Sequence, residues 1–285
     1  MTGVVKRGLK LYYKDKASVF FSLLGVLINF MIFALFIQRG TVEELMVNST
    51  LSTELATGLA NAWIIAGLIA VASVTTGMGA LEIMIADRER GQIKDLMITP
   101  LKDWQITGGY MLTSYTVSVI MSVGMCFIGE LYIVANGGRI LNTREILHVL
   151  CIILLAGFSS SAFICFMTSL LRSISSFSTA SILLGSLVGF LIGNYIPVGF
   201  MPSAIQYIVK CFPVSHAAVL LRQILMQDVF QVIGDTEMIL SVKQVMGVEY
   251  YSNGKPEGMA FHLAVLVITG LVFFALASRN MKRKK

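Results

Sequence analysis

The sequence predicts an all-α polytopic membrane protein with six transmembrane helices, an amphipathic amino-terminal interfacial helix, and short re-entrant or interfacial helices before the last span. Hydrophobic residues make up 56% of the 285 positions, and the mean hydropathy is +0.79. Charged residues make up only 13%, which is about half the usual share for a soluble domain. So few charges cannot cover a soluble surface. A soluble enzyme, a disordered chain and a disulfide-stapled secreted domain are therefore excluded.

Six apolar stretches are long enough to cross the hydrocarbon core, which takes about 20 helical residues. They cover residues 17–38, 59–81, 105–135, 146–170, 178–196 and 260–278. An even number of spans places both termini on the same side of the membrane. Segment 197–259 is external, and its first part is interrupted by Pro197, Pro202 and Pro213. These prolines predict short helices, with an amphipathic one over 214–233.

The distribution of basic residues decides the orientation. Segments on the side of the termini hold 15 of the 22 Lys and Arg residues in 53 positions, and the opposite segments hold 7 in 93. Because cytoplasmic loops carry an excess of basic residues, both termini are predicted to be cytoplasmic in a multi-pass cell-membrane protein of the bacterial plasma-membrane type. The net charge of +6 therefore reflects orientation and contact with membrane lipid, and no nucleic-acid partner is expected.

Residues 1–16 predict an interfacial helix, because basic and apolar side chains separate onto two faces. The basic face holds Lys6, Arg7, Lys10 and Lys14, and the apolar face holds Val4, Val5, Leu9, Leu11 and Tyr12. Such a helix lies in the headgroup plane with its basic stems reaching toward water. Two roles stay open, a membrane anchor or a lever that moves the first span.

The segment 87–101, between the second and third spans, predicts a cytoplasmic helix with one apolar stripe. Charged residues begin it, and apolar residues then recur at i, i+3, i+4 and i+7. The candidate docking residues are Arg88, Glu89, Arg90, Gly91, Ile93, Leu96, Met97 and Pro100. Outside the membrane such a stripe needs a partner. That partner is either the protein's own rim or a separate soluble subunit.

Small residues four positions apart predict a close helix contact in the fifth span, within the subunit or across a dimer. They are Ser181, Gly185, Gly189 and Gly193. Polar residues within other spans are candidates for a transport pathway, because intramembrane polar groups are costly. These candidates are Asn29 and Glu130.

The motifs that would indicate catalysis are absent from the sequence. There is no G-x-x-x-x-G-K-[ST] phosphate loop, so the chain cannot hydrolyse ATP in the P-loop manner by itself. The three histidines, His148, His216 and His262, are far apart in sequence, and no H-E-x-x-H motif is present. We therefore expect no catalytic residues, no metal site and no cofactor bound by this chain.

The layout resembles the membrane subunit of ABC exporters of the type-2 permease family, a family of drug, lipid and polysaccharide exporters. Besides the order of the spans, two stretches carry the resemblance. One is Arg88-Glu89-Arg90-Gly91 running to Leu96 and Thr99-Pro100-Leu101, and the other is Phe212-Pro213-Val214-Ser215-His216 followed by Leu221-Arg222. The resemblance covers almost the whole chain and implies one transmembrane domain over residues 1–285.

The resemblance also implies partners and an activity. Residues 87–101 would be a coupling helix docked on a separate ABC ATPase subunit, which holds ATP and Mg²⁺. A second copy of the chain, or a homologous permease, would complete the transporter, with the first and fifth spans near the dimer interface. The cargo would be a hydrophobic or amphipathic drug, peptide or lipid, moved out of the cell.

Two other classes of function stay open. A self-contained secondary transporter or channel would move cargo without a partner, driven by an ion gradient. A membrane-embedded enzyme, or a non-transporting sensor or immunity protein, would keep its activity after removal of segment 87–101.

Overall fold

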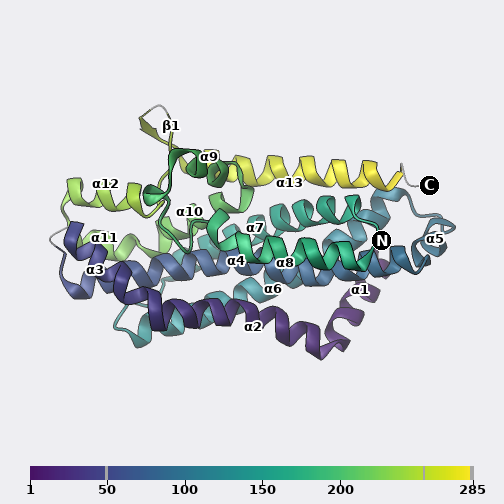
Figure 1. Ribbon diagram of the computed structural model, residues 1–285, viewed down its shortest axis with the longest axis horizontal. Helices are drawn as coiled ribbons and strands as arrows, with labels where there is room; N and C mark the ends of the chain where they lie inside the picture. Colours follow the sequence, from purple (N-terminus) through teal and green to yellow (C-terminus); the bar gives the residue numbers. More distant parts are fainter. Residues whose placement is uncertain (49–50, 253, 283–285) are drawn as a thin grey trace.

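The computed structural model describes residues 1–48, 51–252 and 254–282, and it is an elongated bundle of helices (Figure 1). Both termini lie at one end, which we call the terminal end, and we call the opposite end the far end. Among the described residues, six helices are long and apolar enough to cross a membrane. They cover Val19–Val47, Thr53–Glu89, Asp103–Ala135, Thr143–Leu170, Ile174–Leu191 and Met259–Met281. The predicted all-α polytopic membrane fold is therefore confirmed.

The first span is longer than its apolar pattern predicts. Helix α1 (Thr2–Lys14) precedes α2 (Lys16–Ile32), which continues through a π-helical turn, η1 (Phe33–Ile37), into α3 (Gln38–Asn48). We expected the span to end at Gln38, where the polar Gln38-Arg39-Gly40 sequence begins. The helix continues because the Gln38 amide donates to Asn61 Oδ1 (2.6 Å), so this polar group is satisfied inside the bundle.

Helix α4 (Thr53–Glu89) is the centre of the bundle. It packs against α2, α3 and α10 (Pro213–Leu225), and against α6 (Asp103–Ala135), α7 (Thr143–Leu170) and α8 (Ile174–Leu191). In its most apolar window 89% of the residues are buried, compared with 11% for Val19–Val47. Its many buried Ala and Gly residues allow neighbouring backbones to approach closely, which is how helices associate in lipid. The predicted span 59–81 is extended at both ends.

A ladder of serine hydroxyls joins α6 to α4. Ser114, Ser118 and Ser122 are four residues apart, so they lie on one face of α6. Their hydroxyls donate to the carbonyls of Gly77, Ser73 and Ile69 on α4, at 2.8, 2.7 and 3.3 Å. In the membrane each such bond contributes roughly 0.6 kcal/mol. The ladder therefore sets the register of the two helices as well as adding stability.

Helix α8 ends five residues before the predicted end of the fifth span, at Leu191. Gly193 has a φ of 67°, a left-handed conformation that glycine adopts without strain. The turn is closed by the Asn194 amide, which donates to Gly189 O (2.7 Å). The prediction that Gly193 shares a helical face with Ser181, Gly185 and Gly189 is therefore wrong.

Segment 197–259 folds as short elements at the far end. They are η2 (Val198–Phe200), α9 (Ser203–Cys211), α10 (Pro213–Leu225), α11 (Gln227–Ile233), α12 (Thr236–Val245), β1 (Tyr251–Ser252) and β2 (Lys255–Pro256). The strands pair antiparallel, and α9 and α10 meet at 93°. The last span, α13 (Met259–Lys282), packs on α6, α7 and α10.

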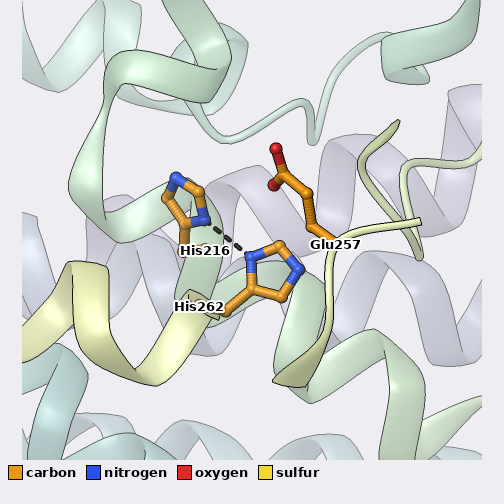
Figure 2. A group of neighbouring side chains, drawn as sticks. All are labelled: His216, Glu257 and His262. Atoms are coloured by element: carbon orange, nitrogen blue, oxygen red, sulfur yellow. Dashed lines mark hydrogen bonds between the residues drawn. The ribbon is translucent and has the colours of Figure 1, made fainter. Parts of the chain in front are cut away.

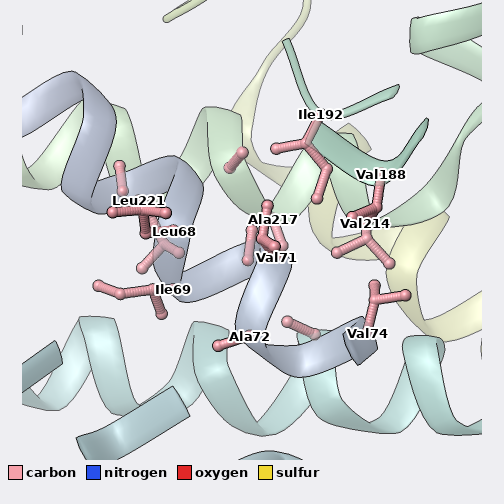
Figure 3. Close-up of a cluster of buried hydrophobic side chains, with 14 of the residues drawn as sticks. Leu68, Ile69, Val71, Ala72, Val74, Val188, Ile192, Val214, Ala217 and Leu221 are labelled. Atoms are coloured by element: carbon pink, nitrogen blue, oxygen red, sulfur yellow. The ribbon is translucent and has the colours of Figure 1, made fainter. Parts of the chain in front are cut away.

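Helix α10 is buried rather than amphipathic. We expected one amphipathic helix over 214–233, but the chain turns at Met226 between α10 and α11. Almost every residue of α10 is buried, because it packs against α4 and α7 and against the start of α13. Figure 3 shows the apolar side chains of α10 meeting those of α4 and the end of α8. These are Val214, Ala217 and Leu221 with Leu68, Val71, Val188 and Ile192.

Arg222 on α10 is fully buried, and its partners among the described residues are backbone carbonyls and an aromatic ring. Its guanidinium donates to Ile192 O, Gly193 O and Gly247 O at 3.3, 2.8 and 3.2 Å. It also lies 5.3 Å from the ring centroid of Trp63 on α4, a cation–π distance. The carbonyls at the end of α8 carry the negative pole of that helix. Arg222 therefore joins α8, α4 and the far-end loops.

Replacing this arginine is expected to destabilise the far end. Arg222→Met removes the donors for three buried carbonyls, and the free energy of unfolding in detergent should fall by about 3 kcal/mol, because hydrogen bonds to a buried charged group contribute about 1.5–3 kcal/mol each. Equilibrium unfolding in mixed micelles measures the change. Arg144→Met, at an exposed position of α7, is the control and should leave stability unchanged. Equal stability of the two variants would contradict the assigned role.

Candidate functional site

The candidate site lies at the terminal end, where α4 stops and the chain crosses to α6. Its centre is Asp87, whose side chain is only 5% exposed. The carboxylate accepts hydrogen bonds from Arg7 Nη1 (2.5 Å) and Nη2 (2.8 Å) and from the Tyr110 hydroxyl (2.6 Å). Burying a carboxylate is costly unless it is paired and hydrogen-bonded in this way. Asp87 therefore joins α4 to α1 and α6.

Arg7 forms the other half of this ion pair. The hydrogen bond to Asp87, together with the negative charge of that carboxylate, raises the pKa of Arg7 above its ordinary value, whereas partial burial opposes the rise. Arg7 Nη2 also donates to Gln92 Oε1 (3.0 Å). Gln92 is the first residue of α5 (Gln92–Met97). Helix α1 therefore contacts the connecting segment directly.

Arg88 points into the bundle and away from the surface. Its Nη1 donates to the carbonyls of Thr168, Ser169 and Leu171 at 3.2, 3.2 and 2.6 Å. These carbonyls lie at the end of α7, where backbone acceptors have no helical donor. We predicted Arg88 as part of a docking surface, but the guanidinium is used inside the protein.

Glu89 completes a set of three charged residues, Asp87, Arg88 and Glu89, which we call the charged triplet. Glu89 Oε2 accepts from the Ile174 backbone amide (3.2 Å) at the start of α8, where a negative charge is favourable. Successive helical residues point about 100° apart. The triplet therefore reaches three different sets of neighbours from a single turn of α4.

The connecting helix is shorter than predicted. We expected a helix over 87–101, but α4 continues to Glu89, and Gly91, with a φ of 77°, turns the chain before the six residues of α5. Thr99 Oγ1 then donates to Leu96 O (2.5 Å), and α6 begins at Asp103. Only the part from Arg90 onward forms the exposed connection.

The exposed apolar residues differ from the predicted stripe. Ile93 is buried and Leu96 is partly buried against the core, whereas the side chain of Met97 lies outside the described part of the chain. Ile98 is 86% exposed and Trp104 is 46% exposed. Ile93 and Leu96 therefore pack on the protein's own rim, whereas Pro100, the last residue of the predicted stripe, is exposed. The residues that face outward are Ile98, Pro100 and Trp104, which we call the exposed tip.

Helix α1 lies closely against α6 at this end. The apolar Val4 contacts Gly109, and Gly8 contacts Thr113, at distances that leave no room for a larger side chain at either glycine. The side chains of Lys6, Lys10 and Lys14 are exposed, as the amphipathic pattern predicts. A cavity of about 370 Å³ lies between α1 and the end of α4. Helix α1 is therefore attached firmly to the helices that bear the exposed tip.

The two pathway candidates have structural partners. Asn29 Oδ1 accepts from the Tyr195 hydroxyl (2.7 Å), which joins α2 to the turn after α8. Glu130 Oε1 accepts from the Leu141 amide (2.6 Å) at the far end and holds the loop between α6 and α7. Each polar group is satisfied by a single contact within the protein, so neither contact by itself indicates a pathway.

The small residues of α8 have different surroundings. A Cβ on Gly189 would lie 2.3 Å from the Tyr195 ring, so this glycine packs inside the chain. Nothing lies within 4 Å of a Cβ on Gly185. Ser181 has a buried hydroxyl with no hydrogen-bond partner among the described residues. Gly185 therefore leaves a gap on α8, whereas Gly189 does not.

Two histidines that are far apart in the sequence meet at the far end. His216 on α10 and His262 on α13 are in contact, and Glu257 lies beside them, with one ligand atom of each within 4.8 Å of the others. The sequence analysis predicts no metal site, and the structure places three side chains of ligand type together at the far end. The spacing in sequence gave no signal, because the fold brings 216, 257 and 262 together.

The fold and this site define a multi-pass helical membrane protein in which one central span connects a short exposed segment to the rest of the bundle. The model of the ABC-2 family transporter proteins matches residues 38–279, and the chain belongs to that family. It is therefore a membrane permease component of an ABC transporter. A comparison with curated proteins finds no match.

Removing the charge at the centre of the site should loosen α1. Asp87→Asn leaves Arg7 without its ion pair, and the free energy that holds α1 in place should fall by about 2 kcal/mol, a typical value for a hydrogen bond to a charged group. Hydrogen exchange of the α1 amides measures this opening. Tyr110→Phe, which keeps the ion pair, should have a smaller effect. Asp95→Asn, at an exposed site on α5, is the control. Faster exchange in Asp95→Asn but not in Asp87→Asn would refute the assignment.

Proposed function

We propose that this chain is the permease subunit of an ATP-driven exporter and that residues 90–104 dock on a separate ABC ATPase subunit. The exposed tip is the observation that carries the proposal. Ile98 and Pro100 lie on a short loop between two spans, and Trp104 lies in the first turn of α6. Exposed apolar side chains gathered at such a place indicate an interaction site. Arg90 and Lys102 flank the tip and supply charges for the rim of such a contact. ATP and Mg²⁺ bind in the partner, and this chain holds neither.

The contacts around the tip support a mechanism of coupling. The ATPase has different affinities for two states of the permease when ATP is bound and when it is absent, and this difference shifts the permease between those states. Motion at the tip passes directly to α4 and α6, which it connects. The Arg7–Asp87 ion pair and the Gln92 contact pass it on to α1. Helix α1 then acts as a lever on the first span.

The same proposal fixes an orientation. The terminal end is cytoplasmic, because it holds most of the basic residues and the exposed tip, and the far end faces outward. The multi-pass chain sits in a plasma membrane of bacterial type. Transport is outward from the cytoplasm.

A second copy of this chain, or a homologous permease, completes the transporter. The first span and α8 are the most exposed spans next to the central helix, with large apolar side chains such as Phe36 and Ile182 turned outward. Gly25 on α2 and Gly185 on α8 both face open space. Small residues on an open face allow a close approach by another helix.

The proposed cargo is a hydrophobic or amphipathic drug, peptide or lipid. A cavity of about 480 Å³ lies at the far end between α3, η2 and α12. Leu45, Phe200 and Met238 form apolar parts of its wall, and Thr41 and Glu44 add polar groups. Mostly apolar walls with a few polar groups suit a ligand with both kinds of surface.

A charge on the exposed tip should weaken docking. Ile98→Asp places a carboxylate where the partner excludes water, and the Kd for the purified ATPase should rise at least about tenfold, as expected for a central interface residue. Co-purification and ATP-driven export of an amphipathic dye from proteoliposomes measure the effect. Ile140→Asp is the matched control, since Ile140 is also exposed but lies in the loop between α6 and α7. Unchanged affinity for Ile98→Asp would overturn the proposed docking surface.

A bulky residue on the open face of α8 should prevent pairing of two permeases. Gly185→Leu fills the gap, and the dimer should dissociate at least about tenfold more readily, as measured by single-molecule subunit counting in nanodiscs. Gly124→Leu on α6, where a Cβ also meets open space, is the control. Gly189→Leu should instead lower the stability of the single chain, because its side chain would overlap the Tyr195 ring. Dimers that tolerate Gly185→Leu would exclude this face.

A further inference from the structure

The far end contains a pair of buried histidines whose rings face each other. His216 Nδ1 and His262 Nδ1 are 2.7 Å apart (Figure 2). Both side chains are almost fully buried. Neither residue takes part in the docking, coupling or dimer contacts described above. Two buried imidazoles that have no part in those contacts indicate a separate chemical role.

The protonation of His216 is set by its backbone partner. His216 Nε2 lies 2.9 Å from Lys210 O, and because a carbonyl only accepts, Nε2 carries the proton. In the neutral ring Nδ1 is then a bare lone pair, and it points at His262. A histidine that ligates a metal almost always donates its other N–H to a carbonyl or a carboxylate in this manner. His216 is therefore already oriented as a ligand.

Glu257 supplies a third donor beside the two rings. Oε2 of Glu257 and Nε2 of His262 are both buried and have no hydrogen-bond partner among the described residues. A buried carboxylate oxygen without a hydrogen-bond partner is costly. A cation bound by Glu257 Oε2 and by Nδ1 of each ring would give the carboxylate oxygen a partner and would leave Nε2 of His262 as the protonated nitrogen of that ring.

We propose that His216, His262 and Glu257 form a divalent metal site, with Zn²⁺ as the preferred ion. Two imidazoles and one carboxylate are a ligand set that zinc uses, at about 2.0–2.2 Å from the metal. Tetrahedral binding separates two such nitrogens by about 3.3 Å, so the rings need to part by only about 0.6 Å. Tyr250 and Phe261 pack around the histidines and give the site a partly apolar wall. Water would occupy the fourth position.

The site would join three parts of the far end. His216 lies near the start of α10, His262 lies in the first turn of α13, and Glu257 lies in the segment after β2 (Figure 2). Metal binding is linked to the conformation that brings the ligands together. Zinc would therefore hold segment 197–259 on the last span. This inference depends on the geometry of the three residues and is independent of the proposed exporter function.

The test uses the full-length chain, purified with a tag that contains no histidine and stripped of metal with a chelator. Equilibrium dialysis with Zn²⁺ should give one ion per chain, and Zn²⁺ should raise the unfolding temperature. Co²⁺ should give the visible absorption of a tetrahedral site. His262→Gln and Glu257→Gln should each raise the Kd for Zn²⁺ at least about tenfold. His148→Gln, at an exposed histidine of α7, should leave it unchanged.

The outcomes are distinct. If the wild-type chain binds no more Zn²⁺ than His216→Gln/His262→Gln, the two rings form only a hydrogen-bonded pair and the proposal is overturned. An equal loss of binding in His148→Gln would also overturn it, because the ion would then bind elsewhere. Glu257 is less buried than the histidines, so Glu257→Gln still tests the site if a histidine variant fails to fold. Unchanged affinity in that variant would reject the three-ligand site.

Discussion

The charged triplet at the end of α4 is the interaction on which the terminal end of this protein depends. Asp87 binds α1 and α6, Arg88 caps the carbonyls of α7, and Glu89 caps the amides of α8. Charged groups next to a membrane are stable where each has a partner, and here three consecutive residues find partners on four helices. The central span therefore orients its neighbours at the point where it leaves the membrane.

Packing within the membrane follows from a different constraint. Lipid tails are as apolar as leucine, so burial of apolar area gives helices little reason to associate. The small residues of α4 and the hydroxyls of α6 supply close contact and hydrogen bonds instead. At the far end Arg222 has a comparable role, since it binds the last carbonyls of α8. Charged groups thus join the helices at the two ends of the bundle. Close packing of small residues and hydroxyl hydrogen bonds join them in the middle.

The sequence predicts the class of fold and the number of spans well, because these follow from the length and hydropathy of each stretch. It predicts their ends less well. The first span passes Gln38 because Asn61, 23 residues away, satisfies the amide. The α8 helix stops at Leu191 although apolar residues continue, because Gly193 turns the chain. Periodicity placed Ile93 on a docking face, whereas the structure buries it and exposes Ile98. The histidine cluster depends on tertiary contacts that no local pattern contains.

The serine ladder between α6 and α4 divides the chemistry unequally between the two helices. Helix α6 contributes hydroxyls, whereas α4 contributes only main-chain oxygens at Ile69, Ser73 and Gly77. Those oxygens are present whatever side chain these three α4 positions carry, so variation there is limited by volume rather than by chemical type. On α6 the hydroxyl itself is needed at Ser114, Ser118 and Ser122. Homologous chains should therefore vary more freely in chemical type at the three α4 positions than at the three α6 positions.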